Sequence, residues 1–365
     1  MASIATGGAR ALDPRGESEA DTGRRLRPVR IWLYVMAALV LVMVVVGGIT
    51  RLTESGLSIT SWKPISGIIP PISQADWEAE FEAYKAIPQY QVLNQWMGLE
   101  DFKFIFWWEW SHRFLGRVLG FAFAVPFVVF LIQRRFHWDL AAPLAGLFVL
   151  GGFQGALGWW MVSSGLTELT SVSQYRLAAH LSAAAFLFIA LVWVARRLRP
   201  GGLPAPAPKG MRLAVLGLLA LVMLQIAAGA FVAGLDAGMA HNTWPLMDGA
   251  LIPAGLSSLE PAWRNLFENA LTVQFVHRGI AYLIVLYLAV MLWRRRRAGG
   301  FAGVYGWLPR IGLLVALQVA LGIATLLAAV PISLAVGHQA LAFMLAGLVT
   351  ACLADLQGTR RQVRV

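Results

Sequence analysis

The sequence has little cysteine. A single residue, Cys352, occurs in 365. One thiol cannot form an intramolecular disulfide or supply a cysteine-based metal site. Cys352 also lies within a long apolar run near the end of the chain. Disulfide-stabilised folds, cysteine metal centres and thiol redox chemistry are therefore excluded.

Charged residues are also scarce. They make up 13% of the sequence, against about 25% in a soluble domain. The apolar residues form long blocks, which is typical of a membrane protein rather than of a large soluble core. Eight blocks are long enough to cross roughly 30 Å of hydrocarbon. They lie near 31–50, 113–133, 141–161, 177–195, 211–234, 271–293, 307–327 and 333–354. The sequence therefore predicts an all-α polytopic membrane protein with eight transmembrane helices.

Acidic residues are few relative to basic ones, 19 against 30, and the net charge is +11. Such an excess could indicate nucleic acid, but its distribution indicates membrane topology instead. The basic residues gather before the first span, between alternate spans and at the end of the chain. If the N-terminus is cytoplasmic, most of them lie inside, as the positive-inside rule requires. We predict a multi-pass protein of the inner (cytoplasmic) membrane with both termini cytoplasmic, in contact with membrane lipid and with no nucleic-acid partner.

The chain repeats itself. The segment 54–62 resembles 236–244, and 154–158 resembles 318–322. Each half contains four spans, so both halves enter the membrane from the same side, which defines a parallel repeat. We predict two pseudo-symmetric four-helix bundles related by an axis along the membrane normal.

These boundaries divide the chain into five parts. They are a disordered basic cytoplasmic tail (1–30), an N-terminal four-helix half (31–197), a cytoplasmic linker (198–210), a C-terminal four-helix half (211–355) and a cytoplasmic tail (356–365). The N-terminal half includes a long outer loop at 51–111. Within this loop, the pattern of 74–87 predicts an amphipathic surface helix that serves as a lid, a spacer or a functional element.

Four of the six histidines take equivalent places in the two halves. His112 and His180 lie near the outer ends of the second and fourth spans, and His277 and His338 near those of the sixth and eighth. A single histidine in a helix is usually a hydrogen-bonded core residue. Ionisable groups are costly inside a bilayer, so four at symmetric positions and similar depth indicate a common function.

Paired imidazoles on facing helices suit haem better than zinc. Zinc takes three or four ligands, and no cysteine or spare carboxylate supplies them symmetrically. Haem iron needs one or two axial ligands and a deep apolar slot, which a helical bundle provides. We therefore predict one haem between His112 and His180 and another between His277 and His338, with haem iron as the only metal.

Four arginines on the outer side run against the positive-inside rule. They are Arg113, Arg117, Arg176 and Arg278. Haem propionates are anionic, which makes these arginines candidate propionate partners. The alternative is that they extend to the outer lipid head groups.

The two halves differ three residues before the first histidine of each pair. Glu109 precedes His112, whereas Gln274 precedes His277. The spacing places each on the same helix face as its histidine. A carboxylate beside a porphyrin is a candidate acid, base or nucleophile, whereas an amide can only hydrogen-bond. We therefore expect chemistry in the first half and an electron-transfer cofactor in the second. The alternative is that Glu109 only pairs with Arg113, one helical turn away.

Several stretches together resemble the haem A synthase family over about residues 30–355. They are RLTESGLSITSWKPISGIIPP at 51–71, EWSHR at 109–113, AGLDAGMAHNTWPLMDG at 233–249, FENALTVQFVHR at 267–278 and VGHQ at 336–339. The first and third most resemble the mitochondrial and Gram-negative type. Another branch of the family has a cysteine pair in an outer loop, which this chain lacks.

The resemblance implies oxidation of the ring-8 methyl group of haem O to a formyl group, giving haem A for terminal oxidase assembly. It implies that His112 and His180 hold the substrate haem O, and that His277 and His338 hold a haem b cofactor. It also implies that Glu109 is catalytic. The implied partners are the haem O-producing farnesyltransferase, oxidase assembly factors, an electron-transfer partner and further copies of the chain in a homo-oligomer.

Two other functions stay open from the residues alone. A di-haem membrane cytochrome b for electron transfer to or from quinone would hold two equivalent haems and would not need Glu109. A haem transporter or chaperone would release its haem chemically unchanged. The chemical identity of the bound haem separates these alternatives from a synthase.

Overall fold

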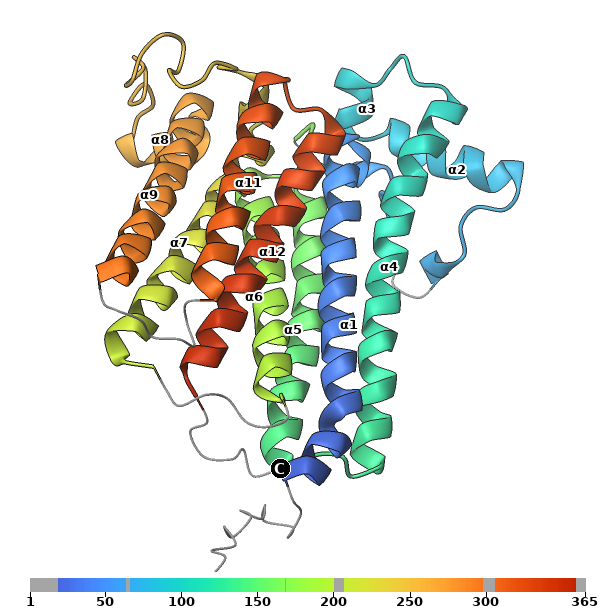
Figure 1. Cartoon of the computed structure of the whole chain (residues 1–365). Coiled ribbons are helices and arrows are strands. Elements are labelled where there is room, and N and C mark those ends of the chain that lie inside the picture. The colour runs from blue at the N-terminus through green and yellow to red at the C-terminus, as the bar shows by residue number, and fades with distance from the viewer. Residues whose placement is uncertain (1–18, 64–65, 168, 200–206, 298–305, 359–365) are drawn as a thin grey trace, which may run out of the picture.

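The computed structural model describes residues 19–63, 66–167, 169–199, 207–297 and 306–358, which form a bundle of long helices (Figure 1). In this part of the chain, eight helices are long and apolar enough to cross a membrane. They are α1 (Glu19–Leu52), α4 (Leu99–Ile132), α5 (Trp138–Ser163), α6 (Gln174–Arg197), α7 (Lys209–Gly234), α9 (Ala270–Arg297), α11 (Trp307–Leu327) and α12 (Ile332–Leu356). The predicted all-α class and the eight predicted spans are confirmed.

Helix α1 begins earlier than its apolar run predicted. It starts at Glu19, and Leu26 and Val29 are buried in the main core cluster with Phe136 and Leu140, around the start of α5. This packing stabilises helix where composition alone suggested a disordered tail. The prediction of disorder is therefore wrong for 19–30, while 1–18 lie outside the described residues.

The other ends agree more closely with the predicted boundaries. Helix α6 ends at Arg197 and α7 begins at Lys209, so most of the predicted linker at 198–210 lies outside these helices. Its central residues, 200–206, are outside the described part of the chain. Helix α12 ends at Leu356, and the tail beyond Gly358 is also outside it.

The helices contact one another in a repeated pattern. In the N-terminal half α1 packs on α4 and α6, and α5 packs on α6; in the C-terminal half α7 packs on α9 and α12, and α11 packs on α12. The halves meet where α6 contacts α7 and where α12 contacts α1 and α6. Helices α1, α6, α7 and α12 therefore form the centre of the bundle. This pattern agrees with two related halves, although the pseudo-symmetry itself stays a prediction.

The loop between α1 and α4 forms a small outer unit at one end of the bundle (Figure 1). Its helical elements are Ser55–Leu57 and Ser66–Ile68, both 3-10 turns, α2 (Gln74–Lys85) and α3 (Pro88–Leu93). Helix α2 confirms the predicted amphipathic helix: Ser73 caps its start, and its apolar face buries Trp77, Phe81 and Tyr84. These rings pack on Phe102 and neighbouring residues of α4.

Helix α4 extends far into the predicted outer loop. It starts at Leu99, where Asp101 accepts a hydrogen bond from the Gly98 N–H at 3.0 Å. Phe102 and Phe106 are buried against the outer unit, and this packing supports about four additional turns at 3.6 residues per turn. His112, predicted to open the helix, therefore lies well inside it.

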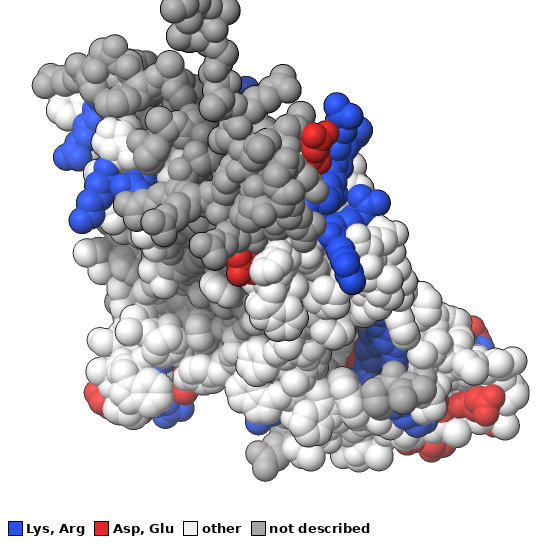
Figure 2. All heavy atoms as spheres, turned by 90° about the horizontal axis from the view of Figure 1, so that it is seen from below, with Lys and Arg blue, Asp and Glu red and all other residues white. Residues whose placement is uncertain are grey.

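The second outer segment, between α7 and α9, contains only short helices. They are the 3-10 turns Ala237–Met239 and Ala262–Arg264, followed by α8 (Asn265–Glu268). Seen from the opposite end of the bundle, Lys and Arg side chains lie in separate groups on the described surface, with Asp and Glu side chains beside some of them (Figure 2).

An ion pair joins the two halves at that end. Arg196 of α6 donates from Nε and Nη2 to the two carboxylate oxygens of Asp355 of α12, each at 2.7 Å. The two side chains are 22% and 10% exposed. In a bidentate ion pair of this kind, each charged group depends on the other for its hydrogen bonds.

We expect Asp355→Ala to lower the free energy of unfolding by about 3 kcal/mol, because it leaves the Arg196 guanidinium without its counter-ion. Thermal unfolding in detergent measures this loss as a lower melting temperature. Asp139→Ala, which removes an exposed aspartate from the first turn of α5, is the matched control. Equal melting temperatures for the two variants would contradict the assigned role.

Candidate functional site

The structure brings the predicted C-terminal histidines together, and it places the N-terminal ones on two helices of the first half. His112 lies on α4 and His180 on α6, while His277 on α9 faces His338 on α12. All four are partly buried. The ring centroids of His277 and His338 are 6.4 Å apart, at an interplanar angle of 71°. Metal–imidazole bonds are about 2 Å long, so two imidazoles on opposite sides of one iron have ring centres roughly 6 Å apart. The C-terminal pair therefore fits a haem iron held between two imidazoles.

Each histidine ring lies against a glycine of a neighbouring helix. A Cβ added at the glycine would lie 2.7–3.1 Å from the Cε1 atom of the ring. The pairs are Gly47 with His112, Gly158 with His180, Gly229 with His277, and Gly322 with His338. Real Cβ atoms essentially never come within 3.0 Å of a neighbour, and contacts below 3.4 Å are already tight. The glycines therefore allow the rings to lie where they do.

Three of the histidines also carry a buried ring nitrogen without a protein partner. The Nδ1 atoms of His112, His277 and His338 have no hydrogen-bond partner in the described structure. Buried polar atoms are normally hydrogen-bonded, so such atoms in a paired arrangement indicate a ligand. The donor set, paired imidazoles in an apolar bundle, suits haem.

Glutamine side chains contact three of the four rings. Gln154 Nε2 lies 3.1 Å from His180 Nδ1, Gln225 Nε2 lies 3.2 Å from His277 Nε2, and Gln318 Nε2 lies 3.5 Å from His338 Nε2. Sequence reasoning treated 154–158 and 318–322 only as marks of the repeat and did not include Gln225. The shared signal was a glutamine four residues before the glycine that contacts the histidine.

Glu109 is buried, 2% exposed, on α4. Its Oε1 accepts hydrogen bonds from Arg113 Nε at 3.0 Å and Nη2 at 2.6 Å. Its Oε2 accepts from Ser58 Oγ at 2.8 Å and from the Ile59 N–H at 2.7 Å. The carboxylate thus ties α4 to the loop after α1, one helical turn before His112. The alternative of a pair with Arg113 is present in the structure, and it does not by itself exclude a role toward a bound substrate.

Gln274 occupies the equivalent position on α9 and is 3% exposed. Its Oε1 accepts from Arg278 Nη2 at 2.7 Å, and its Nε2 donates to the carbonyls of Ala237 at 2.6 Å and Ala240 at 2.7 Å. The two loops present opposite polarity: donors face the carboxylate in the first half, and acceptors face the amide in the second. Each loop therefore provides the hydrogen-bonding groups that its own side chain, Glu109 or Gln274, requires.

The four outer arginines are engaged with outer backbone. Arg113 donates to Ile59 O and Ser61 O, and Arg278 donates to His241 O and Thr243 O, all at 2.8–3.1 Å. Arg117 donates to Lys63 O at 2.9 Å. Arg176 donates to Trp160 O at 2.6 Å and to Ser163 Oγ at 2.9 Å. The arginines position the segments around the histidine sites, while their role toward propionates stays a prediction.

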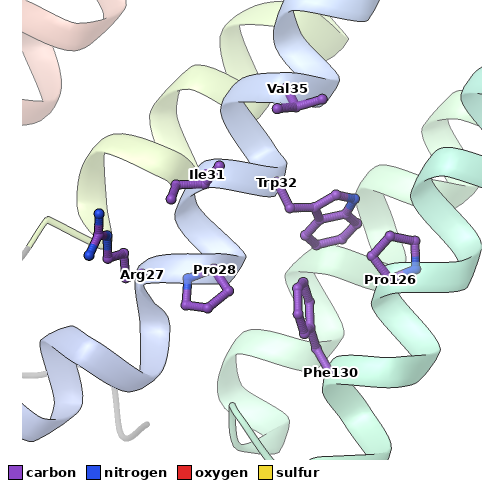
Figure 3. Close-up of a pocket in the computed structure, with 7 residues that line it drawn as sticks. All are labelled: Arg27, Pro28, Ile31, Trp32, Val35, Pro126 and Phe130. Atoms are coloured by element: carbon purple, nitrogen blue, oxygen red, sulfur yellow. The ribbon is translucent and has the colours of Figure 1, made fainter.

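An apolar cavity of about 530 Å³ lies elsewhere, between α1 and α4 (Figure 3). It is lined by Arg27, Pro28, Ile31, Trp32, Val35, Pro126 and Phe130. At 1.5 Å per residue, Pro126 lies about 20 Å along α4 from His112. The cavity contains none of the predicted site residues and is separate from the histidine pairs.

Comparison with known proteins identifies close relatives. Residues 30–350 match the family model described as cytochrome oxidase assembly protein. The haem A synthase of Azorhizobium caulinodans is 56% identical, over 93% of this chain and 97% of that protein. The haem A synthase of Parvibaculum lavamentivorans is 51% identical, over 92% of this chain and 96% of that protein. The haem A synthase of Rhodopseudomonas palustris is also 51% identical, over 94% and 93%.

The glycine contacts give a direct test of the histidine geometry. In Gly322→Ala, the new Cβ would lie 2.7 Å from His338 Cε1, so the imidazole must leave its present position opposite His277. We expect haem retention by this pair to fall about 10–100-fold, the range seen when ligand orientation is disturbed. Haem content of the purified protein measures it. Gly312→Ala on the same helix, whose nearest neighbours would be 3.9 Å away, is the control. Equal haem content in both variants would refute the assigned contact.

Proposed function

The chain belongs to the cytochrome oxidase assembly protein family that includes the haem A synthases, and we propose that its two histidine pairs hold two different haems. It is a haem A synthase, a multi-pass membrane oxidoreductase that converts haem O to haem A. The basis is identity above 50% with haem A synthases over more than nine-tenths of the chain. The assignment of each pair and the catalytic role of Glu109 are the proposed parts.

The N-terminal pair, His112 and His180, binds the substrate haem O in this proposal. The C-terminal pair, His277 and His338, binds a haem b cofactor, which supplies one-electron redox chemistry when bound. The separation of 6.4 Å between the His277 and His338 rings supports two-sided ligation in the second half. The carboxylate of Glu109, set against the amide of Gln274, supports reaction in the first half.

Glu109 acts on the substrate at the outer end of the N-terminal half. Oxidation of a methyl group to a formyl group removes hydrogens from a carbon beside the porphyrin ring and leaves that carbon electron-poor. A carboxylate nearby can stabilise developing positive charge and accept a proton, whereas an amide can do neither well. Four donors from Arg113, Ser58 and Ile59 hold the carboxylate in place, so its orientation is set before substrate binds.

The membrane topology follows from the arrangement of charges. In this proposal the N- and C-termini are cytoplasmic, the linker at 198–210 is cytoplasmic, and the haem sites lie toward the outer face of the inner membrane. Basic residues at the start of α1 and the end of α6 support it under the positive-inside rule. The N-terminal half at 31–197 and the C-terminal half at 211–355 are the two functional units.

The partners follow from the reaction. The substrate haem O comes from the enzyme that farnesylates haem, and the product is passed to oxidase assembly factors. An electron-transfer partner is required because the methyl group is oxidised. Copies of the chain associate as a homo-oligomer in this proposal.

We expect His277→Ala and His338→Ala each to lose bound haem b, because each removes one of the two imidazoles that would hold the haem iron. Pyridine haemochrome analysis of purified protein measures the loss. His137→Ala is the control, since His137 is exposed and lies beside Asp139 at the start of α5. Haem b content that is unchanged in both ligand variants would rule out the assignment of this pair.

We expect Glu109→Gln to lower the rate of haem A formation from added haem O on the order of 10²–10⁴-fold, the usual loss for a general acid or base. In Glu109→Gln the new amide also faces the Ser58 and Ile59 donors. A lower rate would therefore have two possible causes, a weaker contact with the loop and the missing carboxylate, and a second variant separates them. Ser58→Ala removes one anchoring hydrogen bond and keeps the carboxylate. The rate should fall far less in Ser58→Ala than in Glu109→Gln, because three donors still hold the carboxylate, and haem b should be retained in both variants.

Two outcomes would count against the role of Glu109. If Glu109→Gln forms haem A at close to the parental rate, the carboxylate is only a partner of Arg113. If Ser58→Ala is as slow as Glu109→Gln, the loop contact rather than the carboxylate accounts for the loss. A parental protein that converts no haem O and holds two identical haems would favour the di-haem cytochrome instead.

A further inference from the structure

Three of the four histidines share the same glutamine arrangement. Gln154, Gln225 and Gln318 each lie four residues before the glycine that contacts the ring, on α5, α7 and α11. Each amide lies within 3.5 Å of a ring nitrogen. The Nε2 atoms of Gln154 and Gln318 also donate to the backbone carbonyl of the same histidine, at 2.7 and 3.0 Å. In these two pairs the glutamine bridges the ring and the backbone of its histidine, whereas Gln225 contacts the ring of His277.

The fourth histidine lacks this partner. In α1 the residue four positions before Gly47 is Met43. The Met43 methyl lies toward Gly116 of α4, where an added Cβ would meet it at 3.4 Å. A thioether is at most a weak acceptor and cannot donate a hydrogen bond. The Nδ1 atom of His112 has no partner in the described structure, as is also the case for His277 and His338, so what sets His112 apart is the missing glutamine.

We propose that Gln154, Gln225 and Gln318 are positioning residues that fix three of the four haem ligands, and that Met43 leaves His112 as the ligand that releases the iron when haem is exchanged. The inference rests on the proposed assignment of the two histidine pairs. In this proposal the ring orientation is fixed for both histidines of the C-terminal pair but for only one histidine of the N-terminal pair.

The physical basis is the hydrogen bond made by the ring nitrogen that does not bind iron. A histidine that binds iron through one ring nitrogen carries its hydrogen on the other, and an acceptor there fixes the ring orientation and raises ligand basicity. The Oε1 atoms of all three glutamines are buried and have no hydrogen-bond partner in the described structure. A side-chain amide offers both a donor and an acceptor. In each contact the atom beside the ring nitrogen is Nε2, so the amide must turn to bring Oε1 to the ring N–H of a ligated histidine.

The distribution matches the different tasks of the two pairs. Both C-terminal ligands, His277 and His338, have a glutamine, as suits a cofactor that stays bound. In the N-terminal pair only His180 has one. A substrate must enter and its product must leave, so one fixed and one releasable ligand suit this pair.

The first experiment removes the acceptor from the cofactor pair. Gln225→Leu and Gln318→Leu should raise the midpoint potential of the bound haem, because a less basic imidazole stabilises ferric iron less. They should also weaken haem retention by about 10-fold or more. Redox titration and haem content of the purified full-length protein measure both. Gln339→Leu is the matched control: Gln339 is next to His338, but its amide donates to Val44 O at 3.0 Å. Its midpoint potential should equal the parental one.

The second experiment adds the missing partner. Met43→Gln should slow the transfer of bound haem O from the protein to apomyoglobin by about 10-fold or more, whereas Met43→Leu should release it at the parental rate. This variant tests the proposal independently, even if the glutamine variants fail to fold.

The results of these experiments either support the proposal or overturn it. A raised potential in the two glutamine variants, together with slower release in Met43→Gln, supports the proposal. Unchanged potentials in both glutamine variants, or equal release from Met43→Gln and Met43→Leu, overturn it. If the parental protein holds no haem on His277 and His338, the proposed cofactor site fails instead. The parental measurement therefore distinguishes the two failures.

Discussion

The close approach of each histidine ring to a glycine on a neighbouring helix controls where the four imidazoles can lie. A methyl group at Gly322 or Gly47 would meet the ring at less than 3 Å, so the site depends on the absence of a side chain there. Glycine inside a helix costs roughly 1 kcal/mol relative to alanine. The same contact occurs at all four histidines, which indicates that the bundle accepts this cost repeatedly in order to seat the rings between helices.

The outer segments depend on the same helices. Arg113 and Arg278 lie immediately after His112 and His277, and each binds two loop carbonyls as well as the side chain at 109 or 274. Movement of either helix would therefore move both its histidine and its loop. Arg51 connects the halves, because its Nη2 donates to Asp236 at 2.9 Å and to Ala233 O. The histidines, the loops and the junction between the halves therefore form one connected structure.

The sequence predicted the features that rest on long-range pattern. Eight apolar runs and paired histidines were sufficient for the spans and the C-terminal imidazole pair, since bilayer thickness and ligand chemistry leave few alternatives. Features that rest on tertiary packing were missed. The start of α1 depends on the burial of Leu26 and Val29, and the additional turns at the start of α4 depend on Phe102 and its neighbours. Gln225 gave a local signal, but only the structure places its amide beside His277.

The central claim is that one half transforms its haem while the other only holds one. The most direct measurement is chromatographic analysis of the haem extracted from the purified protein after expression with a haem O supply. The account predicts haem b together with haem A or its hydroxylated precursor, in amounts near one of each class per chain. Haem b alone, at two per chain, would contradict it.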